Sequence, residues 1–103
     1  MNVNRLHIYG QTYNHDHAFI VGDTTALIAL RDAIDAALET GSTVGETTVF
    51  AADGEGYDIK VYREEEDKYW DKSLLPYTDE TLYSPPLEDV IGPWDLFKKY
   101  KKG

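Results

Sequence analysis

The order of extended and helical patterns along this 103-residue chain predicts an α+β fold: a four-stranded, mainly antiparallel sheet with one long helix on one face. Two observations lead to this prediction. Runs with period-two alternation flank a single apolar stripe at helical spacing, in the order strand, strand, helix, strand, strand. The last third of the chain loses this periodicity but stays rich in aromatic residues. We therefore expect residues 1–66 to form the core and residues 67–103 to wrap around it as an extension of the same domain.

The first two strands are expected at residues 5–9 and 17–21, joined by the turn-forming residues 10–16. In the first, Leu6 and Ile8 point to one side and the residues between them to the other. Residues 17–21 are apolar on both faces. This pattern is typical of a strand with neighbours on both sides, and it predicts a central position in the sheet.

A helix is expected to follow, because either Asp23 or Thr24 can cap its first turn. The apolar spacing continues to about Thr40, and Gly41 ends it. Since side chains three and four residues apart share one side of a helix, one stripe of this helix is predicted to face the core. The stripe consists of Leu27, Leu30, Ala33, Ile34, Ala37 and Leu38.

Two further strands are expected at residues 47–52 and 57–63, and the glycine-rich loop between them predicts a hairpin. After the acidic run 64–67, no strong helical pattern occurs before residues 93–100. There, Pro93 suits the first helical position and the lysines suit the last turn. The extension is thus predicted to be extended and to end in a short helix.

Charge is distributed unevenly along the chain. The chain carries 19 acidic and ten basic residues, a formal net charge of -9. Four lysines lie in the last six residues, so the body before them has six basic against 19 acidic side chains, or -13. Because nucleic-acid backbones and anionic membrane surfaces bind clustered Lys and Arg, neither partner is expected.

The remaining composition excludes several kinds of site and of protein. With no cysteine, the chain has no disulfide framework, no thiolate nucleophile and no zinc site that uses sulfur. It contains no apolar run of the roughly 20 residues that a spanning helix needs, and the start lacks a signal-peptide pattern, so a cytoplasmic protein is expected. The 13% aromatic content argues against disorder, and abundant Tyr is typical of binding surfaces.

The sheet face that the helix leaves uncovered is the leading candidate for a binding surface. It would carry cations and stacking rings, with the aromatic extension closing over it from the same or a neighbouring subunit. The alternative is that the extension's aromatic residues simply cover this face as a second core layer. The predicted ligand-binding residues are Arg5, His7, Tyr9, Phe19, Lys60, Tyr62, Trp70 and Tyr77.

An acidic row on the outer helix face is a second candidate surface. With the run 64–67 it would imitate a line of phosphates and so occupy a nucleic-acid-binding cleft of another protein. The simpler interpretation is a solvated helix face. The residues of this row are Asp32, Asp35 and Glu39, with Ile28 beside them.

The two histidines of the first turn are a third candidate. His15 and His17 would share a face if extended, and with nearby carboxylates they could bind a divalent metal or act as a general base beside Asp16. No HExxH pattern accompanies them, and a solvated turn is the simpler interpretation. We expect no cofactor and no catalytic residue.

Together these patterns predict a non-enzymatic protein that encloses or sequesters a small, nucleotide-like ligand and forms a homo-oligomer through its C-terminal extension. Small acidic chains of this kind include sequestering proteins of phages and mobile elements, an analogy of size and composition. The alternatives are an acidic protein inhibitor or nucleic-acid mimic, and a metal-dependent enzyme using His15 and His17.

Overall fold

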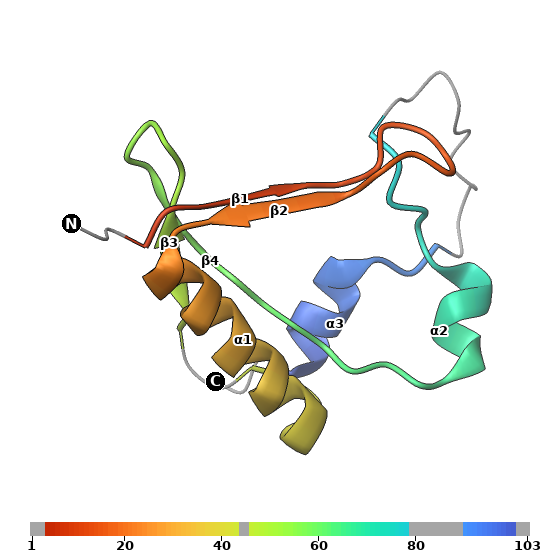
Figure 1. The fold of residues 1–103 in the computed structure, drawn as a ribbon. Coiled ribbons are helices and arrows are strands. Elements are labelled where there is room, and N and C mark those ends of the chain that lie inside the picture. The colour runs from red at the N-terminus through yellow and green to blue at the C-terminus, as the bar shows by residue number, and fades with distance from the viewer. Residues whose placement is uncertain (1–3, 44–45, 79–89, 101–103) are drawn as a thin grey trace. The chain divides into compact units, whose positions relative to one another are not determined.

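A computed structural model describes residues 4–43, 46–78 and 90–100 of the chain (Figure 1). Its contacts divide the chain into two compact units, one made of residues 1–9 and 19–63 and the other of residues 10–18 and 64–103. Among the described residues, the first unit holds the helix α1 (Thr24–Thr40) and four strands, and the second holds two short helices. The α+β class is confirmed.

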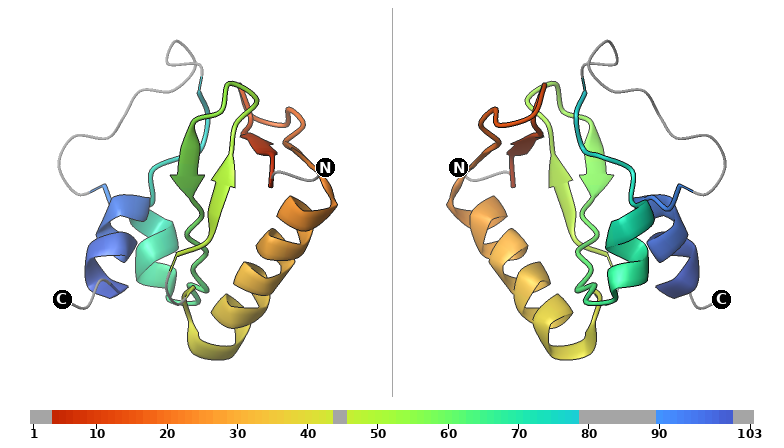
Figure 2. Two further views of the ribbon diagram at one scale, coloured as in Figure 1. Left: turned by 90° about the vertical axis from the view of Figure 1, so that its left-hand side faces the viewer. Right: turned by 90° about the vertical axis from the view of Figure 1, so that its right-hand side faces the viewer.

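The strands form two antiparallel hairpins, as the sequence predicts. β1 (Leu6–Tyr9) pairs with β2 (Phe19–Gly22), and β3 (Thr48–Phe50) pairs with β4 (Gly56–Asp58). The observed strands are shorter than the predicted ones. Figure 2 shows α1 running beside the β3 and β4 hairpin.

The prediction of a single four-stranded sheet is wrong, because the two hairpins remain separate two-stranded sheets. They meet at one parallel bridge, between Arg5 and Phe50. Beyond it, side chains take the main-chain groups that a continuing ladder would use. The Ala52 N–H donates to Nε2 of His7 at 2.9 Å, and the Tyr57 hydroxyl donates to the Leu6 carbonyl. These bonds satisfy the backbone without further strand pairing.

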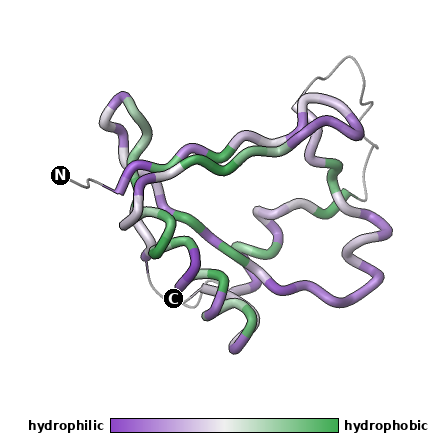
Figure 3. Tube along the Cα trace, in the orientation of Figure 1, coloured by the Kyte–Doolittle hydropathy of each residue, from purple (hydrophilic) through white to green (hydrophobic). Residues whose placement is uncertain are grey.

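β2 is also not the central strand that its sequence predicts. In the described part of the chain it pairs only with β1, and it lies at the edge of a two-stranded sheet. Its apolar side chains on both faces are therefore exposed rather than covered. Figure 3 shows this hydrophobic run along the hairpin.

α1 has the predicted bounds, and its ends show why. The Asp23 carboxylate accepts from the Ala26 N–H at 3.0 Å and caps the first turn. Gly41 follows the last turn with a φ of 100°, a left-handed conformation that glycine adopts without a Cβ clash, and its N–H donates to the Ala37 carbonyl.

The core of the first unit is small and lies between α1 and the strands. Leu6, Ala26, Val49 and Ile59 form its buried centre, with Leu30, Tyr57 and Val61 packed around it. Gly22 lets β2 approach this core closely, because a Cβ there would lie 2.6 Å from Cδ1 of Leu6.

The predicted core stripe of α1 is only partly correct. The buried positions are alanines, Ala26, Ala33 and Ala37, whereas Leu27, Ile34 and Leu38 are exposed. The helix is rotated toward its small side chains, which let its backbone lie close to the core. One flank of large aliphatic side chains is left outside.

The second unit contains one predicted helix and one that the sequence analysis missed. α3 (Pro93–Tyr100) begins at the expected proline, and Lys98 and Lys99 lie in its last turn. α2 (Asp67–Lys72) lies where no helix was predicted. The Nε1 of Trp70, within this helix, donates to the carbonyl of Glu64, in the segment before it, at 2.9 Å.

Candidate functional site

One face of the first hairpin carries a cation, an imidazole and two aromatic rings. Because alternate residues of a strand share a side, Arg5, His7 and Tyr9 lie on the same side of β1. The register places Val21 opposite His7 and Phe19 opposite Tyr9. We call these five residues the His7 face. It brings together four of the eight ligand-binding residues predicted from the sequence.

Two hydrogen bonds hold the imidazole of His7. Its Nδ1 lies 2.7 Å from the Tyr9 hydroxyl, and the two rings meet edge to face with centroids 5.6 Å apart. Its Nε2 accepts from the Ala52 N–H at 2.9 Å. Because Nε2 accepts, a neutral imidazole carries its proton on Nδ1 and donates it to Tyr9. The ring is thus fixed between β1 and the loop after β3.

Arg5 lies at the start of this face and contacts the helix cap. Its backbone N–H donates to Oδ2 of Asp23 at 3.1 Å, the Asp23 N–H donates to the Arg5 carbonyl, and Nε lies 3.5 Å from the same Oδ2. The side chain of Arg5 is still 58% exposed. The guanidinium therefore has accessible N–H donors with which to meet an anion.

A groove of about 290 Å³ adjoins Arg5. Its remaining lining comes from β3 and the loop that follows, and consists of Phe50, Ala51, Ala52 and Gly54. The Ala52 N–H that fixes His7 belongs to this same loop, so the groove and the His7 face adjoin. Sequence reasoning missed Phe50. The sequence does contain a signal for Phe50. Val49 is buried, and because successive side chains of a strand point to opposite sides, the Phe50 ring lies on the outer side of the strand.

A second groove, of about 330 Å³, follows the edge of β1 away from β2. Residues 6–9 line it together with Tyr57, whose hydroxyl donates to the Leu6 carbonyl. Burial raises the pKa of Tyr57 above its ordinary value. The phenol therefore stays protonated and keeps donating throughout the physiological range.

Lys60 and Tyr62 lie away from the His7 face. Phe50 pairs with Gly56 where β3 meets Arg5, and Lys60 comes four residues later, beyond the opposite end of β4. The Lys60 ammonium contacts the Asp58 carboxylate at 2.9 Å. Tyr62 pairs with Ser42 in an isolated bridge just after α1.

Trp70 and Tyr77 belong to the second unit. The Trp70 ring packs edge to face on Tyr69, with centroids 5.2 Å apart. Burial and the nearby carboxylates of Glu64 and Asp95 raise the pKa of Tyr69. Trp70 thus sits in a locally organised segment of the second unit. Tyr77 is half-buried in the same unit, where the neighbouring Thr78 N–H donates to the Gln11 carbonyl at 3.0 Å.

The acidic row of α1 is exposed. Asp35 and Glu39 belong to it, and Ile28 beside them is also exposed. Asp32 is paired with the neighbouring Arg31, with N and O atoms 3.3 Å apart and both side chains largely exposed. An ion pair of this kind contributes little to stability. The row therefore stays available to a cationic partner.

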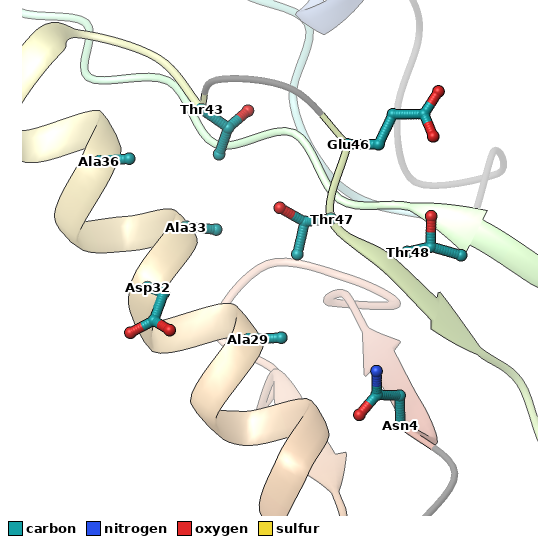
Figure 4. Close-up of a pocket in the computed structure, with 9 residues that line it drawn as sticks. All are labelled: Asn4, Ala29, Asp32, Ala33, Ala36, Thr43, Glu46, Thr47 and Thr48. Carbon is teal, nitrogen blue, oxygen red and sulfur yellow. The ribbon is translucent and has the colours of Figure 1, made fainter.

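A cleft of about 390 Å³ lies beside this row, between α1 and the start of β3. Figure 4 shows the methyl groups of Ala29, Ala33 and Ala36 pointing toward Thr47 across the cleft, and the Glu46 carboxylate turned away from the helix. The lining also carries polar side chains, namely Asn4, Asp32, Thr43, Thr47 and Thr48. The Thr43 hydroxyl is buried and has no hydrogen-bond partner among the described residues. The cleft therefore offers polar as well as apolar groups to a ligand.

His15 and His17 lie in the turn of the second unit and are exposed. His15 has a φ of 67°, and the His17 N–H donates to Oδ1 of Asp16 at 2.9 Å. This is the local side-chain bonding typical of a turn. Across residues 4–43, 46–78 and 90–100, no group of three or more His, Asp or Glu side chains is arranged to hold a metal ion.

None of the helices in the described ranges is long and apolar enough to cross a bilayer.

Comparison with known proteins finds no match to any family model, curated protein or solved structure.

Proposed function

We propose that this chain is a non-enzymatic binding protein that holds a small, nucleotide-like ligand on the His7 face and in the groove beside Arg5. The observation that carries the proposal is the placement of Arg5, His7, Tyr9 and Phe19 on one side of a single hairpin. The groove of about 290 Å³ lined by Phe50 adjoins Arg5. A ring platform beside a cation suits a planar base joined to a phosphate.

Three features support this assignment. The groove volume of about 290 Å³ is near the lower end for small-molecule sites, which suits a mononucleotide-sized ligand. The two hydrogen bonds on His7 fix the platform before the ligand arrives, and this lowers the entropy cost of binding. Arg5 supplies an exposed guanidinium in a chain body that has six basic and 19 acidic side chains, so it is one of the few groups of this body that can attract an anion.

The proposal has a direct test in calorimetric titration with adenosine diphosphate, guanosine diphosphate and inorganic phosphate. In Tyr9→Ala, nucleotide affinity should fall about 5- to 150-fold, because stacking of one base on one ring is worth roughly 1–3 kcal/mol. Tyr13→Ala is the matched control, since Tyr13 is an equally exposed tyrosine in the turn. Its affinity should equal that of the wild type.

Two results would contradict the proposal. One is the absence of any binding heat with these nucleotides, together with an apo mass for the natively purified protein. The other is an equal loss of affinity in Tyr9→Ala and Tyr13→Ala, because this would place the ligand away from the His7 face.

A second candidate function is capture of a basic cleft of another protein by the acidic row. The exposure of Asp35, Glu39 and Ile28 favours it. Reversal of charge in Asp35→Lys and Glu39→Lys should abolish such capture at low salt and leave nucleotide titration unchanged. If both properties survive, the row is a solvated helix face.

A further inference from the structure

The outer edge of β2 is the most exposed apolar part of the first unit. Phe19, Ile20 and Val21 are 55%, 53% and 60% exposed, although they are consecutive and point alternately to the two faces of the hairpin. A strand that is apolar on both faces is typical of the interior of a sheet. Here it has one neighbour, β1, among the described residues. β2 therefore presents exposed apolar side chains beside an edge that has no strand partner among the described residues, and a strand of another chain can pair there.

The hydrogen-bonding pattern shows which groups of β2 face outward. The Asp23 N–H donates to the Arg5 carbonyl, so residues 5 and 23 form a hydrogen-bonded pair. In an antiparallel ladder these pairs alternate, and hence 7 with 21 and 9 with 19 are the next hydrogen-bonded pairs. The N–H and C=O of Ile20 consequently point away from β1, toward the open edge.

Apart from the short length of β2, four residues, this edge lacks the sequence features that normally prevent strand addition. Between residues 18 and 22 there is no lysine, no proline and no ionisable side chain. The strand pairs with β1 residue for residue, so no bulge turns the edge away. Natural edge strands usually carry at least one of these features, because a bare edge pairs with other chains.

We propose that two copies of this chain dimerise by antiparallel pairing of β2 with β2, about a twofold axis at Ile20. In this register Ile20 meets its own copy as a hydrogen-bonded pair and exchanges both outward main-chain bonds with it. Phe19 lies opposite Val21 of the second copy, an aromatic and β-branched pair of the kind that stabilises sheets. The two hairpins then form one four-stranded sheet.

A second copy fits this edge better than an unrelated strand, because the register is complementary to itself in size and charge. It places Ala18 opposite Gly22 of the second copy, and these small residues let the two backbones approach. At both ends of the paired segment it places His17 opposite Asp23 of the second copy, so no like charges face each other there. The dimer would bring two His7 faces onto one sheet, but it does not depend on the ligand proposal.

Sedimentation velocity of the full chain and two lysine variants tests the proposal. Ile20→Lys puts two ammonium groups opposite each other at the twofold axis, and the dimer dissociation constant should rise at least about tenfold. Ile8→Lys is the matched control, because Ile8 is paired with Ile20 on the same face and is 51% exposed, but it lies on β1, away from the proposed pairing edge. It should remain dimeric. A monomeric wild type, or equal dissociation of both variants, would overturn the proposal.

Disulfide formation between engineered cysteines tests the register and does not require the lysine variants to fold. The natural chain has no cysteine, so engineered thiols are unique. Phe19 and Val21 of the second copy form a pair without main-chain hydrogen bonds, with Cα atoms about 4.5 Å apart, which a disulfide spans. A mixture of Phe19→Cys and Val21→Cys should yield a covalent heterodimer under mild oxidation, and either variant alone should yield much less. Equal yields in all three samples would refute this register.

Discussion

At the scale of single residues, Tyr57 joins the core to the edge of β1 through one hydrogen bond. Its hydroxyl donates to the Leu6 carbonyl, and removing it in Tyr57→Phe leaves a partly buried acceptor without its partner. We expect a loss of about 1–3 kcal/mol in the free energy of unfolding at neutral pH, measured by urea denaturation.

The same residue predicts a change in stability at high pH. Burial raises the pKa of Tyr57 in the folded state above the ordinary value of 10.0. The folded protein then holds this proton to higher pH than the unfolded chain does. The resulting stability is fully present below pH 10.0 and is lost as the pH rises through the folded-state pKa. Urea titrations across this range should show a smaller alkaline loss in Tyr57→Phe than in Tyr13→Phe, and parallel profiles would contradict this assignment.

The sequence predicts which residues of one strand share a side. It does not predict which residues of different hairpins lie together, because this depends on how the strands pair. Alternation alone puts Arg5, His7 and Tyr9 on one side, whatever the strand pairs with. Adding Lys60 to that group required the two hairpins to be neighbours along their whole length. Among the described residues, their strands instead share one bridge, between Arg5 and Phe50.

At the scale of elements, Asp23 has two functions, since it caps α1 and links the helix to β1. Oδ1 accepts from the Ala26 N–H and the Thr25 hydroxyl, and Oδ2 accepts from the Arg5 N–H. A helix cap alone is worth about 0.5–2 kcal/mol, and the link to Arg5 adds to it. We expect Asp23→Ala to lower the free energy of unfolding by about 2–3 kcal/mol in urea denaturation.

Asp32→Ala is the matched control for this prediction, because Asp32 lies on the same helix and makes one exposed ion pair. It should change stability by less than about 0.5 kcal/mol. Similar losses in the two variants would mean that the cap does not anchor the helix. In Asp23→Asn the amide oxygen can still accept from the Ala26 N–H, but the amide nitrogen cannot accept from the Arg5 N–H, so the loss in this variant measures the link to Arg5.

The limits of α1 could be predicted from its sequence, but its rotation could not. Asp23 and Gly41 act locally through capping and backbone conformation, so their signals do not depend on neighbours. The face of a helix that is buried depends on how closely it approaches the core. Ala26, Ala33 and Ala37 permit a closer approach than Leu27 or Ile34, although the latter residues are more hydrophobic.

At the scale of the whole molecule, the absence of a continuous sheet follows from side chains that replace main-chain pairing. His7 takes the Ala52 N–H and Tyr57 takes the Leu6 carbonyl. Both residues are consistent with strand positions in the sequence, and nothing in their spacing shows that they would end the ladder. The apolar side chains on both faces of β2 predicted a central strand. β2 is central only in the four-stranded sheet of the proposed dimer.

Salt dependence distinguishes this dimer from one held by charges. Two chains of net charge -9 repel each other, and screening lengths of about 30 Å at 0.01 M salt and 10 Å at 0.1 M weaken that repulsion. Residues 18–22 carry no charge, so pairing at β2 should tighten as salt rises. An oligomer formed through the lysines of the C-terminal extension and the acidic row of α1 should instead weaken. Sedimentation velocity at the two ionic strengths separates these cases. Dissociation at the higher salt would contradict pairing at β2, and Ile20→Lys should have the higher dimer dissociation constant at both ionic strengths.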